Sequence, residues 1–487
     1  MKKLLLSTIL LVCAIVMKAQ DVMVATLDGA TGTKAYNGAN AFINAVKDAQ
    51  SGDRITLSPG TFKAPTIDKS LIIQGSGFVS DPDNGFYRTA IDGRLIIHLP
   101  QDDTNDLYIE GLYSNNEFYF ESEKPITLND LTIKKCVIGS LYLSHDGYRG
   151  SNISTNNALI EHCRISSLLL GGAKNKDANL TITNSVINAV PNNNEESSIN
   201  FLNSVIIGNY SSTIARFENC IFTDDYCWMP AASVIEHCLS FFNRSFDNVL
   251  TKNVFWDSSA DKVFVDATSE YSETASYELT DDAKSTFVDE YGDQIGLYGG
   301  ISPYSPITSN PQILSRAIAS RSSNGTLSVN VQVEGDIETY EYWFDTDYTK
   351  KQTGECSGIF DYDLNVSTLN EGIHLFNLRF RDTQGQWSSP ITYNFYNVSY
   401  TPTSNEAIKV VSNDINTLIV PSDATVANIY LYTTSGQQVK HISIANPTGD
   451  IDLRPYYRDL ESGLYIIKIE VSTKDRTIVN SYKLTVR

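Results

Sequence analysis

Short apolar segments recur between residues 133 and 255, and apolar and polar positions alternate within each of them. They read IKKCVI, IEHCRI, ITNSVI, FLNSVI, FENCIF, IEHCLS and LTKNVF. A period of two residues is typical of a β-strand with one buried face. The spacers between segments are rich in Asn, Ser, Gly and Asp, which favour turns. The pattern therefore predicts many short strands with no helices between them.

Aligning the segments places one small residue per segment in the same position. This row is Cys136, Cys163, Ser185, Ser204, Cys220, Cys238 and Asn253. If each segment belongs to one coil of a parallel β-helix, successive coils stack about 4.8 Å apart and like residues form ladders inside the stack. The residues one position earlier are expected at a turn: Lys135, His162, Asn184, Asn203, Asn219, His237 and Lys252.

An end of such a stack needs a cover, because it exposes unpaired backbone groups. Residues 38–50 carry apolar side chains at helical spacing, and Ser51 and Gly52 follow them. We therefore predict a capping helix before the first coil. The strands RITLSPGTF and SLIIQGSG come next.

This opening region resembles the pectin-lyase-like right-handed parallel β-helix superfamily. The resemblance is carried by AFINAVKDAQSGDRITLSPGTF and IDKSLIIQGSGFVSDPDNGFYRTAIDG, and it extends over about residues 25–300. DEYGDQIGLYGG at 289–300 looks like the closing coil of secreted bacterial members. The resemblance implies the fold and leaves the function open, because the same fold serves lyases, hydrolases, adhesins and binding proteins.

Two further β domains are expected after a Pro-rich linker. Alternating segments such as TLSVNVQVEG and TYEYWFD predict an immunoglobulin-like sandwich over residues 309–400. LNEGIHLFNLRFRDTQGQWSSPITYNFY within it resembles a module of secreted Bacteroidetes proteins. Residues 405–487 resemble the C-terminal sorting domain of type IX secretion through SGQQV, GLYIIKI and the basic Lys483 and Arg487. The usual opening Asn-Pro pair is absent, so a terminal sandwich without a sorting role is the alternative. The expected fold is all-β: a right-handed parallel β-helix with an N-terminal capping helix over 20–308, then two small antiparallel β-sandwiches.

The N-terminus predicts export. Lys2 and Lys3 precede an apolar run from Leu4 to Met17, which has the length of a signal peptide rather than of a spanning helix. Cleavage after Ala19 makes residues 1–19 the signal, and lipidation at Cys13 is the alternative. We therefore expect a secreted or outer-surface protein without a transmembrane segment.

The net charge and the cysteine positions argue against several classes of binding partner and cofactor. The formal charge of −20 disfavours nucleic acid and anionic lipid. Because four cysteines fit the inner ladder, a Cys/His metal site is not expected. No cofactor is expected either, except calcium if the protein is a lyase.

Two kinds of site residue stand out. Weak catalytic candidates are His145, Asp146 and Arg149 in SHDGYRG, and Asp224 and Asp225 after CIFT. Aromatic residues are dense in the predicted loops and strand edges, and flat rings stack on the faces of sugars. The ligand-binding candidates among them are Tyr142, Tyr148, Tyr226 and Trp228.

No acidic constellation of a β-helix hydrolase is recognisable, so we assign no active site. The leading hypothesis is a surface β-helix protein that binds glycan or another surface polymer without catalysis. A polysaccharide lyase or glycoside hydrolase is the first alternative. An adhesin or structural surface protein is the second.

Overall fold

A computed structural model provides the structure of the chain. It describes residues 23–79, 87–100, 105–121, 126–143, 153–169, 180–190, 198–208, 210–211, 214–224, 227–228, 233–242, 249–256, 258–323, 325–398, 409–411, 417–420, 423–433, 437–447, 450–460, 463–474 and 477–486. The predicted signal segment 1–19, with both Cys13 and the cleavage point, lies outside the described residues. In the described part of the chain, no helix has the length and apolar character needed to cross a membrane.

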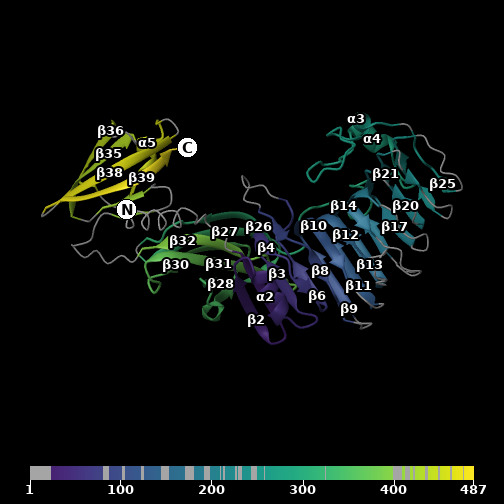
Figure 1. The fold of residues 1–487 in the computed structure, drawn as a ribbon, viewed down its shortest axis with the longest axis horizontal. Coiled ribbons are helices and arrows are strands. Elements are labelled where there is room, and N and C mark those ends of the chain that lie inside the picture. Colours follow the sequence, from purple (N-terminus) through teal and green to yellow (C-terminus); the bar gives the residue numbers. More distant parts are fainter. Residues whose placement is uncertain are drawn as a thin grey trace, which may run out of the picture. The chain divides into compact units, whose positions relative to one another are not determined.

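The fold is all-β and is dominated by two long sheets, which Figure 1 shows as rows of neighbouring strands. The first sheet has the order β2 (Gly32–Asn37), β1 (Val24–Gly29), β3 (Arg54–Leu57), β6 (Leu71–Gln74), β9 (Asn105–Glu110), β11 (Ile126–Lys134), β13 (Ile153–Glu161), β15 (Leu180–Thr183), β17 (Ser198–Leu202), β20 (Ile214–Glu218), β23 (Val234–Glu236) and β25 (Leu250–Lys252). From β3 onward its strands pair in parallel.

The second sheet is parallel as well. Its order is β4 (Gly60–Lys63), β7 (Thr89–Asp92), β10 (Leu112–Phe120), β12 (Val137–Tyr142), β14 (Arg164–Leu169), β16 (Val186–Ala189), β18 (Val205–Ile206), β21 (Ile221–Phe222) and β24 (Leu239–Ser240). Beside β10, β8 (Leu95–Ile97) continues the sheet to β5 (Thr66–Ile67). A separate short parallel pair joins β19 (Tyr210–Ser211) and β22 (Cys227–Trp228). Each of the first six recurring segments ends a strand of the first sheet and begins a strand of the second, as in a β-helix, whereas LTKNVF ends β25 and is followed by an isolated bridge from Phe255 to Leu239.

The inner ladder of small residues is confirmed. Cys136, Cys163, Ser185, Ser204, Cys220 and Cys238 are all fully buried. Hydrogen bonds link neighbouring members, since the Cys163 N–H donates to Ser185 Oγ at 3.0 Å and the Ser185 N–H to Ser204 Oγ at 3.3 Å. Small side chains are required here because the chain turns sharply between the two sheets.

The predicted turn row is confirmed for six of its seven residues. Lys135, His162, Asn184, Asn203, Asn219 and His237 all have a positive φ, between 44° and 56°. Asn tolerates this left-handed conformation better than most residues. One residue per coil in this conformation produces the turn from the first sheet to the second.

The last member of both rows was predicted wrongly. Strand pairing places Glu236 opposite Lys252, so Asn253 lies opposite His237. Asn253 accordingly has φ 52°, and its Nδ2 lies 2.8 Å from His237 Nε2. Asn253 therefore belongs to the turn row, and Lys252 ends strand β25.

A second buried face was not predicted. The outward residues directly after the inner ladder form a row: Val137, Arg164, Val186, Val205, Ile221 and Leu239. All six are buried. The apolar members share a core cluster with Val263, Phe264 and Tyr277 of residues 258–293, here called the covering segment, and with Ile295 and Leu297 beyond it. Arg164 Nε donates to Tyr304 Oη at 3.0 Å. The covering segment contains α3 (Ala260–Val263) and α4 (Asp281–Thr286). The two-residue alternation alone predicted only the inner face.

Residues 294–310, the return segment, run back along the turn row. The Gly296 N–H donates to Asn219 O at 2.8 Å, and Asn184 Nδ2 donates to Leu297 O and Gly299 O, both at 2.9 Å. Further along, His162 Nε2 lies 3.1 Å from Ser302 O. In the described residues, 289–300 contain no strand and therefore add no coil to the long sheets.

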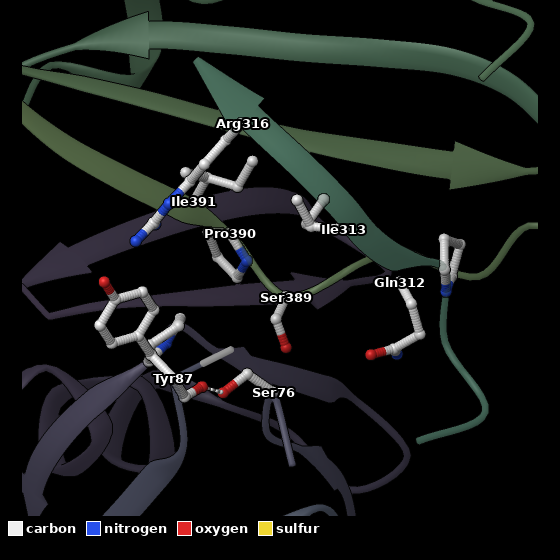
Figure 2. Close-up of a pocket in the computed structure, with 10 residues that line it drawn as sticks. Ser76, Tyr87, Gln312, Ile313, Arg316, Ser389, Pro390 and Ile391 are labelled. Carbon is white, nitrogen blue, oxygen red and sulfur yellow. Dashed lines mark hydrogen bonds between the residues drawn. The ribbon is translucent and has the colours of Figure 1, made fainter. Parts of the chain in front are cut away.

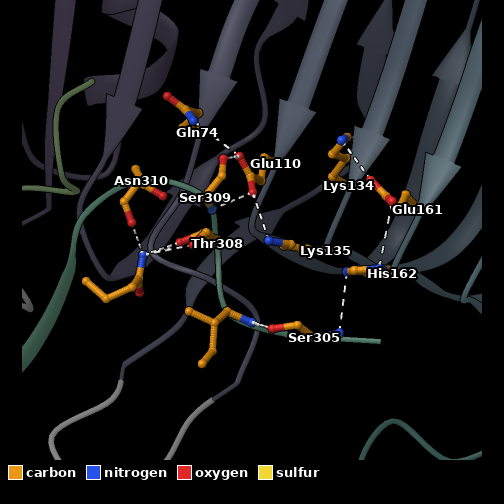
Figure 3. A network of polar contacts seen from close by, with 12 residues as sticks. Gln74, Glu110, Lys134, Lys135, Glu161, His162, Ser305, Thr308, Ser309 and Asn310 are labelled. Atoms are coloured by element: carbon orange, nitrogen blue, oxygen red, sulfur yellow. Dashed lines mark hydrogen bonds and ion pairs between the residues drawn. The ribbon is translucent and has the colours of Figure 1, made fainter. Parts of the chain in front are cut away.

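The return segment ends on a buried carboxylate. Glu110 is fully buried and accepts hydrogen bonds from the Ser309 N–H at 2.7 Å and Ser309 Oγ at 2.6 Å (Figure 3). It also accepts one from Tyr108 Oη at 2.7 Å. Lys135 Nζ lies 3.7 Å away. Burial alone would raise the pKa of Glu110, but these hydrogen bonds outweigh it and hold the pKa below its ordinary value of 4.5. Glu110 is therefore ionised, and its carboxylate holds the end of the return segment through the hydrogen bonds from Ser309.

The predicted helix at the N-terminal side is confirmed as α2 (Ala41–Asp48). Its buried side chains, Ala41, Phe42, Ala45 and Val46, belong to the same core cluster as the inner rows of the long sheets. The strands expected after the helix are β3, β4 and β6. The sequence pattern thus located this end of the stack correctly.

Smaller sheets follow, and β28 pairs antiparallel with β29 and with β31. One sheet has the strand order β26 (Gln312–Ile318), β27 (Thr326–Glu334), β30 (Ile359–Asn365). The other has the order β29 (Gln352–Glu355), β28 (Ile337–Phe344), β31 (Gly372–Asp382), β32 (Ile391–Asn397). A 3-10 turn, η2, covers Tyr348–Lys350. The chain divides into two compact units: residues 1–317, 330–361 and 375–393 form the first, and residues 318–329, 362–374 and 394–487 the second.

A buried ion network within the first unit ties β31 to the first strand of the chain. The fully buried Arg379 donates to Asp28 Oδ2 at 2.7 Å and Oδ1 at 2.8 Å, and its Nε donates to Glu341 Oε1 at 2.6 Å. Trp343, also buried, packs there with Val24 and Tyr348. Although burial opposes ionisation, the Arg379 charge holds the pKa of Asp28 below its ordinary value. Part of the predicted sandwich region therefore shares a compact unit with the parallel stack.

The C-terminal residues form two more antiparallel sheets in the second unit. One joins β33 (Lys409–Val411), β34 (Thr417–Ile419) and β37 (Asp450–Asp452), and the other has the order β36 (Gln438–Ala445), β35 (Ala424–Thr433), β38 (Gly463–Thr473), β39 (Thr477–Val486). A short helix, α5 (Arg454–Tyr457), follows β37. Leu418, Ile429, Leu453 and Ile469 belong to their shared core.

Candidate functional site

Most of the candidate site residues taken from the sequence lie outside the described residues. These are His145, Asp146, Tyr148, Arg149, Asp225 and Tyr226; of Trp228 only the backbone, in β22, is described. Asp224 is half-buried just after β21. Over the described ranges, no group of three or more His, Cys, Asp or Glu side chains is arranged to hold a metal ion. Among the ligand-binding candidates, Tyr142 is the one whose side chain lies within the described residues, and it lies on the outer face of the second sheet.

Tyr142 belongs to a row of half-buried outward side chains on neighbouring strands. Strand pairing aligns Ile96 of β8 with Tyr119 of β10, Tyr119 with Tyr142 of β12, and Tyr142 with Leu169 of β14. We call these four residues the tyrosine row. Tyr142 and Leu169 lie five positions beyond the buried Val137 and Arg164 of the same strands, and all four residues of the row remain partly open to solvent.

The two tyrosines are brought into register by a bulge in β10. Between Ser114 and Glu117 the pairing with β12 shifts, so that Asn115 and Asn116 face the single residue Gly139. A Cβ on Gly139 would lie only 2.3 Å from Asn115 O, so glycine is required where the bulged backbone comes close. Without the bulge, Tyr119 would shift to the opposite face of the sheet.

The ring centroids of Tyr119 and Tyr142 lie 5.5 Å apart, with planes inclined at 56°. The Arg94 guanidinium lies over the Tyr119 ring at 4.9 Å from its centroid, and the same guanidinium pairs with Glu117. Glu117 begins a second outward row, which continues with Ser140 and Ser167. The face therefore presents two aromatic rings beside a carboxylate and two hydroxyls.

The protonation state of Tyr119 suits hydrogen bonding. Burial, reinforced by the negative charge of Glu121, raises its pKa above the ordinary value of 10.0. The phenol therefore keeps its proton and can act as a donor throughout the physiological pH range. This combination of rings and hydroxyls is suited to binding a saccharide, whose faces are apolar and whose edges carry hydroxyl groups.

The other described aromatic residues of the predicted loops and edges have structural roles. Phe118 is fully buried inside the stack. Tyr108 donates to Glu110, and Tyr113 lies beneath the Arg88 guanidinium, 3.6 Å from ring centroid to carbon. The sequence placed Tyr119 in the same aromatic group as Tyr142 but did not predict that the two are paired, because their alignment depends on the bulge. The recurrence of Tyr at the third position of EFYF and of SLYL was the available signal.

Comparison with known proteins gives no family. No protein-family model matches the chain, and no curated protein matches it. Similar segments of solved structures include dimeric latent PorU from Porphyromonas gingivalis, at 13% identity and TM-score 0.15, over 41% of this chain and 23% of that one. A two-domain fibronectin type III segment of chicken tenascin gives 12% identity and TM-score 0.15, over 37% of this chain and 100% of that one. Apo β-glucuronidase 3 of Bacteroides uniformis gives 9% identity and TM-score 0.18, over 72% of this chain and 58% of that one.

The chain thus spans 23% of the PorU chain and 58% of the β-glucuronidase chain. Likenesses with TM-scores this low carry no argument about fold or activity. The candidate site therefore rests on the geometry of the tyrosine row.

Proposed function

We propose that this protein binds glycan or another extended surface polymer on the outer face of its second parallel sheet, without catalysing a reaction on it. The observation that supports this proposal is the pairing of Tyr119 and Tyr142 on adjacent strands, beside Glu117 and Ser140. Parallel coils repeat the same outward positions about every 4.8 Å. A polymer lying across the strands would therefore meet Tyr119 and Tyr142 on adjacent strands, with Ile96 and Leu169 on either side.

The proposed setting is the outside of the cell. The apolar run at Leu4–Met17 supports export through a cleaved signal peptide, and the pattern of residues 405–487 supports a type IX sorting role. The parallel stack supports a relationship to the right-handed β-helices of the pectin-lyase-like superfamily. The antiparallel sheets support two β-sandwiches after it.

A binding and product assay tests this function against its alternatives. The mature protein is incubated with a panel of neutral and uronate polysaccharides, with and without calcium, and both bound polymer and new chain ends are measured. We expect binding without new reducing or unsaturated ends. New ends would establish the lyase or hydrolase alternative, and no binding to any soluble glycan would favour the adhesin or structural alternative.

Two tyrosine variants locate the binding. Tyr119→Ala and Tyr142→Ala should each lower the affinity for the best-binding polysaccharide of the panel about tenfold, because each variant removes one stacking ring. Tyr291→Ala is the matched control, since Tyr291 is 83% exposed and lies in the covering segment. Equal affinity of all three variants and the unmodified protein would overturn the proposed site.

A further inference from the structure

A pocket with a cavity volume of about 60 Å³, partly open to solvent, lies within the first compact unit, and none of its lining residues belongs to the tyrosine row. Its described polar lining consists of Ser76, Tyr87, Gln312, Arg316 and Ser389. Its apolar walls are Pro59, Pro311, Ile313, Pro390 and Ile391. Figure 2 shows Arg316 beside Tyr87 at one side, Gln312 at the other, and Ser389 between them.

Arg316 supplies a positive charge to this pocket. Its guanidinium carbon lies 4.6 Å from the centroid of the Tyr87 ring, which holds the side chain by a cation–π contact. No carboxylate among the described residues forms an ion pair with it. In a chain with a net charge of −20, such a cation is a local exception to the overall field. It therefore favours an anionic group in the pocket.

Ser389 supplies a second unused donor. Its Oγ is buried and has no hydrogen-bond partner among the described residues. A buried hydroxyl without a partner costs free energy, which a ligand acceptor would recover. By contrast, the hydroxyl of Ser76 is already engaged, because it donates to Tyr87 O at 2.8 Å.

Gln312 supplies an acceptor. Its Nε2 donates to Asn310 O at 2.6 Å and approaches Thr308 Oγ1 at 2.5 Å and Thr308 O at 3.4 Å. The two carbonyl acceptors fix the orientation of the amide. Its Oε1 is thus left to accept a hydrogen bond, and no described residue donates to it.

We propose that this pocket binds the free C-terminal carboxylate of a peptide whose last residue is apolar. Arg316 and Ser389 would donate to the carboxylate, Gln312 Oε1 would accept from the last backbone N–H, and the proline and isoleucine walls would hold the side chain. A ligand with this donor, acceptor and apolar group is an acylated amino acid. This inference does not rest on the proposed glycan binding, because none of its residues belongs to the tyrosine row.

The same geometry disfavours an acidic sugar. Among the described lining residues Tyr87 is the one aromatic side chain, and it carries the Arg316 guanidinium over its ring, so no second ring is present to complete a stacking surface for a pyranose. The remaining walls are aliphatic and do not pair with ring hydroxyls. The experiment must therefore distinguish binding of a peptide C-terminus from binding of a uronate, which is the alternative ligand.

Calorimetric titration of the full chain with acetyl-Gly-Leu tests the proposal. We expect saturable binding of the free acid, and at least about tenfold weaker binding of acetyl-Gly-Leu amide, which lacks the charge. Arg316→Gln should lower the affinity for the free acid by a similar factor. It should also remove most of the difference in affinity between the acid and the amide. Arg316→Lys should retain part of that difference, because it keeps the positive charge.

Matched controls make the outcome decisive. Arg458→Gln, at a side chain 76% exposed, should leave the titration unchanged. Equal binding of acid and amide, or no binding of either to the folded protein, would overturn the proposal. Tighter, Arg316-dependent binding of glucuronate would overturn it in favour of a sugar acid. Tyr142→Ala should not change the peptide titration, so failure here is distinguishable from failure of the glycan proposal.

Discussion

The backbone N–H of Cys163 donates to Ser185 Oγ at 3.0 Å, from one coil of the parallel stack to the next. The same relationship continues from Ser185 to Ser204, and the N–H of Cys220 lies 3.3 Å from Cys238 Sγ. The inner ladder therefore satisfies buried backbone donors that the sheets leave unpaired. Its Cys and Ser side chains have a structural role.

Removing one ladder hydroxyl should be costly. Ser185→Ala leaves the buried Cys163 N–H without its acceptor, so we expect the free energy of unfolding to fall by about 1–3 kcal/mol. Ser185→Cys should cost less, because cysteine occupies the same position in four other coils. Urea denaturation of the three proteins measures both effects, and an unchanged midpoint for Ser185→Ala would contradict the ladder.

The fold of this region was largely predictable from the sequence, because one repeated pattern encodes both the ladder and the turn. The exception at 252–253 has a simple cause: Asn fits both a small inward position and a left-handed turn, and only strand pairing decides between them. The covering segment could not be predicted, since it has no repeat of its own. The tyrosine row depends on a bulge that the loop-like sequence of Asn115 and Asn116 conceals.

A charged side chain introduced on the buried outer face of the second sheet should destabilise the protein. Val186 is fully buried on the outer face of the second sheet. Val186→Asp should lower the free energy of unfolding by about 3 kcal/mol or more, because the new carboxylate has no partner there. Thr181→Asp, on the half-buried outer face of the first sheet, is the control and should change little. Similar midpoints for both variants would show that the outer row is open to solvent.

The buried Glu110 should make stability depend on pH. A carboxyl whose pKa is lowered by folding adds stability above its unfolded value, and this contribution is lost as the pH falls through the folded pKa. We therefore expect the free energy of unfolding to fall as the pH drops below about 4.5. Glu110→Gln should make the free energy of unfolding depend less steeply on pH between pH 6 and pH 3. The decrease in slope should correspond to the uptake of about one proton at most. Identical slopes would mean that Glu110 is not held as an anion.

Breaking the Arg379 network should destabilise the first compact unit. Arg379→Met removes the arginine that pairs with both Asp28 and the almost fully buried Glu341, although Glu341 keeps Lys351 Nζ at 3.2 Å. We therefore expect a loss of about 3 kcal/mol. Arg458→Met removes an exposed arginine and should leave the denaturation midpoint unchanged. Thermal unfolding monitored by circular dichroism compares the two, and an equally small effect for Arg379→Met would show that the network does not secure this unit.

Glycan binding on the tyrosine row is the central functional claim, and hydroxyl-radical footprinting with mass spectrometry tests it most directly. The unmodified protein is oxidised with and without the polysaccharide that binds best. The account predicts reduced oxidation of Tyr119 and Tyr142 when polymer is bound, with Tyr291 unchanged. Saturating polymer that leaves both tyrosines as reactive as before, while protecting other residues, would contradict it.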